Sequence, residues 1–167
     1  MASESGIGEV FDRLVALLTE SKANFRVIEH EPEGRSEAIS VIRGNRPEQA
    51  AKAMVLDVRG GGGGRRSVLA ILPGNAKLDF NAVAQAFEAR KAGFASPDSA
   101  QALTGCVMGS VPPFSLNPVL SIVVDEELLK NDTLFFNAGR LDRSMELDTR
   151  DWLAVAQPKV ARIAAKA

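Results

Sequence analysis

The stretch that decides the fold is KAMVLDVR (52–59), GGGGG (60–64), RR (65–66) and SVLAIL (67–72). Its two outer segments are short apolar runs bounded by glycine or charge, which predicts two strands. Five glycines in a row have high backbone entropy and no side chains to pack, so we interpret them as a hairpin loop. A phosphate-binding P-loop would continue with Lys, then Ser or Thr, and a helix, whereas here two arginines and a strand follow.

Upstream of this hairpin the pattern predicts a helix, a strand and two short helices. Six residues fall on one face of the first helix: Val10, Phe11, Leu14, Val15, Leu17 and Leu18. A strand is expected at FRVIEH (25–30), followed by a helix that Ser36 caps and Gly44 ends. Pro47 suits the first turn of another short helix, PEQAAK (47–52).

Downstream, helices and strands alternate, and most of them are short. Asp79 is expected to cap one helix, and Ser96-Pro97 to open another that Gly105 closes, with a strand at AGFAS (92–96) between them. VLSIVVD (119–125) is typical of a fully buried strand, and TLFFNAG (133–139) with RSMELD (143–148) of a hairpin. Asp148 or Thr149 caps a last helix, and Pro158 separates it from a short C-terminal one.

The connections between strands decide the fold class. Several are hairpins and the intervening helices are short, which argues against a doubly wound parallel sheet. We therefore predict an α+β (mixed α/β) single domain over residues 1–167, with a mixed, curved sheet and helices packed outside it. The 167 residues are enough to bury a core without a metal or a disulfide.

Composition excludes several classes of protein. Hydrophobic residues make up 46% of the chain and charged residues 25%, as in soluble globular proteins. No run of 18 apolar residues and no secretory signal is found, so we expect a cytoplasmic protein that binds no membrane. With 20 basic and 21 acidic residues the chain is no DNA-binding module, and any nucleic-acid contact must be small and local.

The counts of cysteine and histidine limit metal chemistry. Cys106 is the only cysteine and His30 the only histidine. This excludes a Cys-based zinc site and a site of the HExxH type, whereas a Cys-His pair stays arithmetically possible. We expect no metal and no cofactor. We interpret Cys106 as buried packing, which is the usual role of a lone cysteine.

One loop and one lysine could carry chemistry. The loop is GSVPPF (109–114), in which two prolines fix the backbone and a glycine allows close approach of a ligand. It could present N–H groups to an oxyanion, or it could be a stiff crossover between a helix and a buried strand. Lys52 lies before an apolar strand, where it could reach into a pocket or simply extend into solvent.

The same segments, taken in order, resemble the YbaK/ProX family of trans-editing aminoacyl-tRNA deacylases, which are related to the editing domain of bacterial prolyl-tRNA synthetase. The resemblance covers nearly the whole chain, from the first helix to Pro158, and four segments carry it. They are FRVIEHEPEGRSEAISVIRG (25–44), QAAKAMVLDV (49–58), LTGCVMGSVPPFS (103–115) and FNAGRLDRSMELDTRDWLAVAQP (136–158). Each segment is weak alone, whereas the order and spacing are specific.

The resemblance implies a site made of the lysine and two loops. Lys52 matches the family's active-site lysine, and with Gly109 and Ser110 it forms the expected catalytic set. The expected substrate-binding residues are Val111, Pro112, Pro113 and Phe114 of the first loop, Asn137, Ala138 and Gly139 of the second, and His30. For His30 a bracing role and a general-base role both remain open, and bracing is favoured.

The resemblance also implies the reaction and its partners. The enzyme would cleave the ester of a mischarged aminoacyl-tRNA by holding its CCA end, with an aminoacyl-tRNA synthetase as a second partner. Ala53 follows Lys52 where alanine-specific members have asparagine, and HEPEGRSEAIS (30–40) with FNAGRLDRS (136–144) indicates the branch that removes Ser or Thr. The alternatives are a non-catalytic tRNA-associated or regulatory module with the same pocket, and a hydrolase of free esters.

Overall fold

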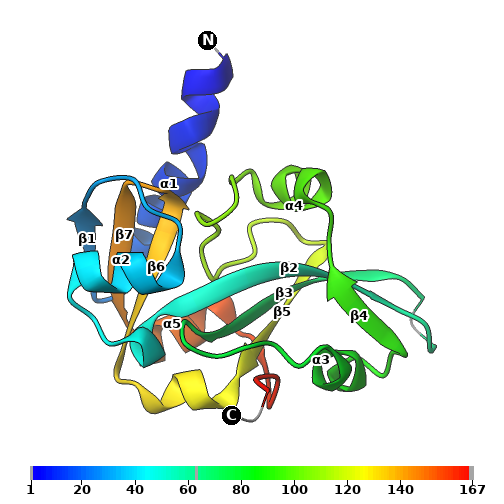
Figure 1. Cartoon of the computed structure of the whole chain (residues 1–167). Helices are drawn as coiled ribbons and strands as arrows, with labels where there is room; N and C mark the ends of the chain where they lie inside the picture. Colours follow the sequence, from blue (N-terminus) through cyan, green and yellow to red (C-terminus); the bar gives the residue numbers. More distant parts are fainter. Residues whose placement is uncertain (1, 63, 166–167) are drawn as a thin grey trace.

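The computed structural model describes residues 2–62 and 64–165, and it divides the strands into two sheets (Figure 1). In the smaller, antiparallel sheet the strand order is β1 (Phe25–Glu29), β7 (Arg143–Asp148), β6 (Thr133–Arg140). In the larger sheet the order is β4 (Lys91–Phe94), β2 (Ala51–Arg59), β3 (Arg66–Pro73), β5 (Leu120–Asp125), β8 (Lys159–Ala161). The α+β class is confirmed, but two joined sheets replace the one curved sheet that we expected.

The glycine-rich hairpin is confirmed as the centre of the larger sheet. Strands β2 and β3 pair antiparallel from Ala51↔Pro73 to Val58↔Arg66, and the glycines lie in the connection. On its far side β3 pairs with β5 in parallel, and β5 pairs in parallel with β8. Strand β5 packs Leu120 and Val124 into the main core on one face and Val123 into a smaller core on the other, which explains its continuous apolar run.

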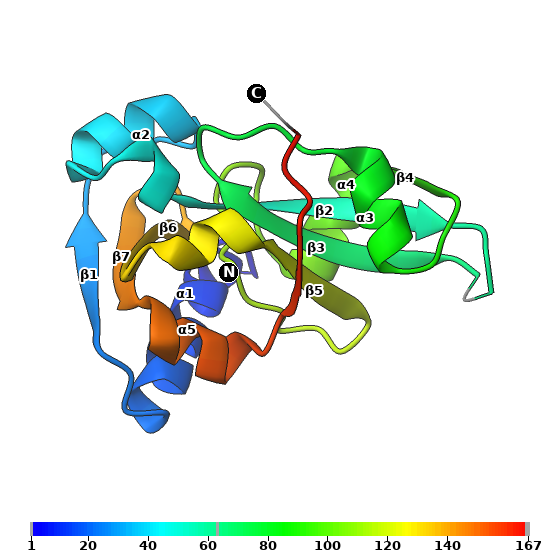
Figure 2. The same cartoon turned by 90° about the horizontal axis from the view of Figure 1, so that it is seen from below.

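Helices cover both faces of the larger sheet, and Figures 1 and 2 show how they are arranged. The helix α3 (Phe80–Ala86) packs on one face over a small core that includes Leu56, Val68 and Val83. The opposite face belongs to the main core, which also includes partly buried side chains of α4 (Pro97–Thr104) and the buried Trp152 of α5 (Thr149–Ala156).

The first helix, α1 (Ala2–Glu20), joins the main core through the apolar face that its sequence predicts. Val10, Leu14 and Leu18 are buried there, and the helix contacts β6. Gly139 of β6 has φ +83°, and a Cβ at that position would lie 2.8 Å from the Val10 side chain. Glycine is therefore required here for both the backbone conformation and the close approach of α1.

Several helix ends are as predicted. The Asp79 and Ser96 side chains cap α3 and α4, and Asp148 rather than Thr149 caps α5. Gly44 ends α2 (Ser36–Arg43), and Gly105 ends α4, both with left-handed φ values.

Other local predictions were wrong. Arg35, not Ser36, occupies the N-cap position of α2, and its side chain makes no capping bond. The helix expected at 47–52 is only the 3₁₀ turn η1 (Pro47–Gln49), because the following residues enter β2. The segment after Pro158 is strand β8 rather than a helix, and the 3₁₀ turn η2 (Glu126–Lys130) was not predicted.

The buried carboxylate of Asp125 explains why the C-terminal segment is extended. Its Oδ1 accepts hydrogen bonds from the backbone N–H groups of Ile163 and Ala164, both at 2.8 Å. Its Oδ2 accepts from the N–H of Glu127 at 3.1 Å, which starts η2. One acidic side chain at the end of β5 thus fixes both segments that pattern reading missed.

We predict that Asp125→Ala lowers the free energy of unfolding by about 2–4 kcal/mol, because buried N–H donors lose a charged acceptor. Asp125→Asn should cost less, since an amide oxygen still accepts from Ile163 and Ala164. Urea unfolding followed by circular dichroism measures both changes. An Asp125→Ala variant as stable as the parent protein would contradict this role.

Candidate functional site

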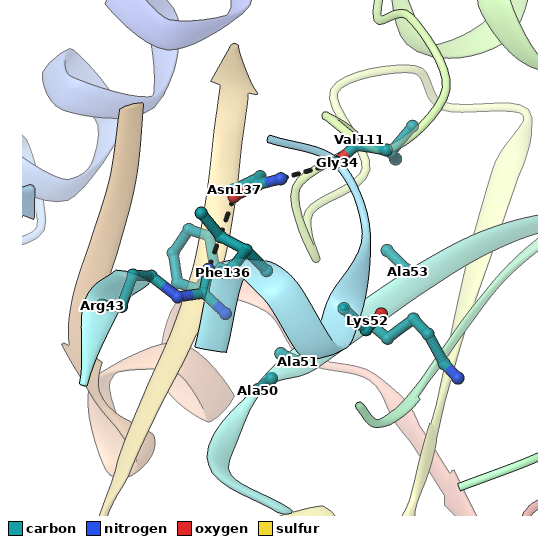
Figure 3. Close-up of a pocket in the computed structure, with 12 residues that line it drawn as sticks. Gly34, Arg43, Ala50, Ala51, Lys52, Ala53, Val111, Phe136 and Asn137 are labelled. Atoms are coloured by element: carbon teal, nitrogen blue, oxygen red, sulfur yellow. Dashed lines mark hydrogen bonds between the residues drawn. The ribbon is translucent and has the colours of Figure 1, made fainter. Parts of the chain in front are cut away.

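A small cavity of about 70 Å³ lies where the two sheets meet. The sheets are joined there by a parallel bridge between Ala50 and Phe135, at the start of β2 and within β6. Three groups of residues line the cavity (Figure 3). They are Gly34, Ser36, Ile39 and Arg43 around α2, Ala50, Ala51, Lys52 and Ala53 at β2, and Gly109, Val111, Phe136 and Asn137 opposite.

The cavity exists because β2 begins with small side chains. Ala51 and Ala53 share the face of β2 that turns toward the main core and the cavity. Lys52, between them in sequence, points to the other face, and Figure 3 shows its side chain leading away from Asn137 and Arg43. Its Nζ donates to the carbonyl of Ala76 at 2.7 Å and lies 3.5 Å from that of Gly74. Burial lowers the pKa of Lys52 below its ordinary value.

The loop that begins at Gly109 is held against the β1–α2 connection by backbone contact. Gly109 has φ +88°, and a Cβ there would lie 2.8 Å from the Cα of Gly34. Ser110 is buried, its Oγ donates to the carbonyl of Val107 at 2.8 Å, and its own carbonyl accepts from the Gly139 N–H at 2.9 Å. The Ser110 hydroxyl therefore ties the loop together and does not line the cavity.

The prolines of this loop anchor it in the core instead of contacting the cavity. Pro112, Pro113 and Phe114 are buried, and the carbonyl of Pro113 accepts from the Trp152 indole at 2.9 Å. The Phe114 ring packs edge-on against Phe136, with 5.8 Å between ring centroids. Phe136 lines the cavity, so this contact connects the anchored loop to the cavity wall.

Asn137 uses its whole side-chain amide to join these segments. Its Nδ2 donates to the carbonyls of Gly109 at 2.6 Å and Glu33 at 3.1 Å. Its Oδ1 accepts from the Ser144 hydroxyl at 3.0 Å and lies 3.4 Å from Nη1 of Arg43. Both N–H donors and both acceptor positions are thus occupied, which leaves no hydrogen-bonding group of Asn137 for a ligand.

Arg43 is the charged group that sequence reasoning missed. Its Nε donates to Asn45 at 2.9 Å, and its Nη1 lies 3.2 Å from the Ser144 hydroxyl and 3.4 Å from Oδ1 of Asn137. Among the described residues no carboxylate pairs with it, and no hydrogen bond from Nη2 is found. Burial lowers the pKa of Arg43 to about 10.

A signal for Arg43 was present in the sequence of α2. Arg43 follows the buried Ile39 by four residues and so shares its face of the helix, while Val41, 82% exposed, points outward. An arginine on the inner face of an amphipathic helix, beside outward aliphatic residues, indicates a functional cation.

His30 lies one hydrogen bond behind the cavity wall. Its Nδ1 is 2.7 Å from the carbonyl of Glu31, which can only accept, so Nδ1 carries a proton. Its Nε2 is 2.7 Å from the hydroxyl of Ser144, which in turn contacts Asn137 and Arg43. The histidine is therefore linked to the cavity through Ser144 and does not line it.

Strand β2 presents an open backbone edge to the cavity. The carbonyl of Val55 accepts from the Ala95 N–H at 3.0 Å, so alternate residues of β2 direct their N–H and C=O groups away from β3. Strand β4 pairs with β2 only over 56–59, and Ala53 lies beyond that pairing. The Ala53 N–H is therefore directed toward the space that Ala53 lines.

The predicted site residues thus fall into three positions. Lys52, Gly109, Val111 and Asn137 line the cavity, and His30 lies behind it. Ser110, Pro112, Pro113, Phe114, Ala138 and Gly139 support its walls. Cys106 is buried, as the sequence predicted, and burial raises the pKa of its thiol to about 11.

In the part of the chain that the structure describes, no three His, Cys, Asp or Glu side chains are grouped as metal ligands. No helix in the same residues is long and apolar enough to cross a membrane.

A family profile and two relatives with similar sequences are described as acting on aminoacyl-tRNA. The family profile described as the aminoacyl-tRNA editing domain matches residues 30–155. Relatives from Escherichia coli K12 and Escherichia coli O157:H7 are each 45% identical over 149 residues, which is 89% of this chain and 89% of theirs. Both are named multifunctional Ser/Thr-tRNA deacylase ProXp-y.

Two solved structures share the fold. The hypothetical protein APE2540 has a TM-score of 0.81 at 20% identity, over 91% of this chain and 99% of that one. A candidate trans-editing enzyme for prolyl-tRNA synthetase has a TM-score of 0.79 at 22% identity, over 94% and 98%. With the profile match and the relatives at 45% identity, these likenesses confirm the predicted resemblance: the chain belongs to the aminoacyl-tRNA editing domain family.

Proposed function

We propose that this protein is a trans-editing deacylase that hydrolyses the ester of Ser- or Thr-charged tRNA. Two relatives that match 89% of the chain carry the name Ser/Thr-tRNA deacylase. Membership of the editing-domain family supports the same reaction class. The proposed substrate-binding region is the cavity between α2, β2 and the Gly109 loop.

Two features of the cavity carry the proposal: its small volume, and the Nη2 group of Arg43, for which no hydrogen bond is found among the described residues. A cavity of about 70 Å³ admits only a small side chain. Arg43 reaches it with a guanidinium whose other donors bind neutral groups. A serine or threonine hydroxyl can accept a hydrogen bond from Nη2, whereas an alanine side chain leaves that donor unpaired in a partly dry site.

The reaction needs little beyond positioning. Water adds to the ester carbonyl carbon, the bond to the ribose oxygen breaks, and the products are the free amino acid and an uncharged tRNA end. The developing oxyanion needs N–H donors, and the open N–H of Ala53 faces the cavity where the ester would lie. A terminal ribose hydroxyl of the substrate can assist the water.

Lys52 can contact the substrate in the proposed mechanism only if its ammonium changes hydrogen-bond partners. To touch the substrate its ammonium has to exchange its bonds to the carbonyls of Ala76 and Gly74 for new ones. A hydrogen bond from a charged group contributes about 1.5–3 kcal/mol, so the exchange requires that the substrate offer a comparable acceptor. The alternative contribution is indirect: the ammonium fixes the Gly74–Ala76 turn beside the start of β2.

The proposed partners follow from the same chemistry. The CCA end of an aminoacyl-tRNA is the ligand, and a synthetase that misactivates Ser or Thr is the proposed second partner. The net charge of −1 agrees with a protein that grips only the end of the tRNA.

The decisive experiment is a deacylation panel of Ser-, Thr-, Ala- and Pro-charged tRNAs with the purified protein. We expect rapid loss of the Ser or Thr ester and slow loss of the Ala and Pro esters. A preference for the Ala ester, or no hydrolysis of any ester, would refute the proposal.

Replacing Arg43 should narrow the preference for a hydroxyl-bearing amino acid. We expect Arg43→Met to reduce the Ser over Ala ratio of kcat/KM by about 5- to 30-fold, which corresponds to about 1–2 kcal/mol, the scale of one partly buried hydrogen bond. Arg43→Lys keeps the charge and should recover part of the ratio. Arg46→Met, at an exposed arginine of the same segment, is the matched control and should leave the ratio unchanged. An unchanged ratio in Arg43→Met would remove Arg43 from substrate recognition.

Asn137→Ala should behave differently, because its amide binds only protein groups. We predict a loss of about 1–3 kcal/mol in unfolding free energy, since the carbonyls of Gly109 and Glu33 lose a donor. Hydrolysis of Ser- and Ala-charged tRNA should fall by similar factors. A selective loss of Ser over Ala discrimination, with stability retained, would instead make Asn137 a direct reader of the hydroxyl.

Lys52→Ala should abolish hydrolysis while the protein stays folded, as expected for a half-buried side chain outside the main core. Lys52→Met, which keeps the apolar stem, separates charge from packing. Single-turnover assays and thermal unfolding of both variants provide the measurement. Full activity in a folded Lys52→Ala protein would exclude Lys52 from the site.

A further inference from the structure

A chain of hydrogen bonds runs behind the cavity wall and centres on the hydroxyl of Ser144, which is fully buried. Its Oγ lies 3.0 Å from Oδ1 of Asn137 and 3.2 Å from Nη1 of Arg43, and both of these residues line the cavity. On the other side Oγ lies 2.7 Å from Nε2 of His30. The ring of His30 continues the chain outward, with Nδ1 2.7 Å from the carbonyl oxygen of Glu31. Ser144 therefore connects the cavity wall to the histidine behind it.

Backbone carbonyls at both ends of this chain fix which atoms carry hydrogen. Nδ2 of Asn137 donates to two carbonyls, at 2.6 and 3.1 Å, so the amide has one orientation and Oδ1 faces Ser144. Because Oδ1 can only accept, its contact with Ser144 needs the hydroxyl proton. The carbonyl of Glu31 likewise requires a proton on Nδ1 of His30.

Three contacts of the chain each need one proton. They are Nδ1 to the Glu31 carbonyl, Nε2 to the Ser144 hydroxyl, and that hydroxyl to Oδ1 of Asn137. A neutral imidazole supplies one proton and the hydroxyl supplies one, so one of the three contacts would join two acceptors. An imidazolium supplies two, and every contact then holds a proton. The other lone pair of Ser144 Oγ accepts from Arg43.

The charges around His30 permit a cation there. Most charged side chains of the adjoining segments are already paired: Arg26 with Glu146, Arg35 with Glu33, Arg140 with Asp142, and Arg143 with Glu29 and Asp142. Among the ion pairs of the described residues, neither Glu31 nor Glu37, at the start of α2, has a partner. Arg43 opposes a second positive charge, but the ring of His30 is only half-buried and Glu31 follows it directly.

We infer that His30 is a positioning residue, which holds the Ser144 hydroxyl toward Asn137 as long as its ring is an imidazolium. Loss of the Nε2 proton turns the hydroxyl toward the ring, so Oδ1 of Asn137 loses its donor and the wall beside Arg43 loosens. An imidazolium has no free lone pair on either nitrogen, so the same assignment excludes His30 as the general base. The effect on substrate choice rests on the proposed function, because it acts through the guanidinium that is proposed to bind the substrate hydroxyl.

The charge on the ring can be measured without any substrate. His30 is the only histidine, so the ring ¹⁵N resonances of the untagged protein are assigned without overlap. At about pH 7.5, where an unperturbed histidine is mostly neutral, we expect both nitrogens protonated in the folded protein and a neutral ring in urea. Ser144→Ala should make the folded ring neutral, whereas Ser121→Ala, at a serine of β5, should not. A neutral ring in the folded parent protein would overturn the inference, whether or not seryl-tRNA is hydrolysed.

Hydrolysis gives an independent test of the positioning role. Between about pH 6 and about pH 8.5, a range that spans the titration of an ordinary histidine, the Ser over Ala ratio of kcat/KM should fall about fivefold, the scale of one hydrogen bond. His30→Gln keeps an N–H donor for Ser144 at every pH, so its ratio should stay near the low-pH value of the parent protein. His30→Ala lacks that donor and should have the low ratio throughout.

A general base at His30 would give the opposite results. After correction for uncatalysed hydrolysis, the rates for both esters would rise with pH, and His30→Gln would lose hydrolysis of both. That outcome, or a Ser over Ala ratio that does not change with pH in the parent protein, would overturn the positioning role. If no ester is hydrolysed at all, the proposed function fails, and the ring resonances alone decide the charge of His30.

Discussion

The side-chain amide of Asn137 is the interaction on which the rest of the site depends. It joins β6 to the β1–α2 connection through Glu33 and to the Gly109 loop through the Gly109 carbonyl. Its oxygen faces Ser144 and Arg43, which belong to β7 and α2. These contacts hold five segments in one arrangement around the cavity: β6, β7, α2, the β1–α2 connection and the Gly109 loop. Gly109 adds a direct backbone contact with Gly34, because a Cβ at Gly109 would lie only 2.8 Å from the Gly34 Cα.

This junction also explains why the larger sheet leaves a useful edge. Strand β2 meets β6 at the Ala50↔Phe135 bridge and meets β4 only from Leu56 onward. Between these two points β2 turns the small side chains of Ala51 and Ala53 toward the cavity and has an open backbone edge at Ala53. The cavity and a larger apolar groove, between the end of β4 and α4, occupy that interval, one on each side of the wall formed by the Gly109 loop. The site is thus a consequence of incomplete strand pairing, with Asn137 holding the opposite wall in place.

Periodicity and capping residues predicted most of the local structure, because those signals lie within a few residues of each other. The β2–β3 hairpin, the apolar face of α1 and the caps at Asp79 and Ser96 are of this kind. The errors involve partners distant in sequence. Strand β8 pairs in parallel with β5, and the carboxylate of Asp125 accepts from the N–H groups of the residues just after β8, 38 and 39 positions away. No local pattern records these partners. The division into two sheets likewise depends on pairing between distant strands.

The same limit applies to the site. Lys52, Gly109, Val111 and Asn137 were placed at the cavity by resemblance to a family and not by physical reasoning from spacing. Arg43 and Ser144 escaped because neither occurs in a recognisable motif, and their meeting across 101 residues is a tertiary contact. Only the inward position of Arg43 on α2 was readable, through its spacing from Ile39.

The cavity and the groove differ in the chemistry of the residues that line them. The cavity is small, and the guanidinium of Arg43 lies at its wall. Burial lowers the pKa of Arg43, because a charge held away from water is less stable. A substrate oxygen that accepts from Nη2 offsets part of this cost, so discrimination comes from a group that is under-satisfied without ligand. The groove, by contrast, has no charged side chain among the described residues that line it, and it offers mainly apolar area. A protein built in this way needs no basic surface, and the near balance of 20 basic and 21 acidic residues follows from where its contacts lie.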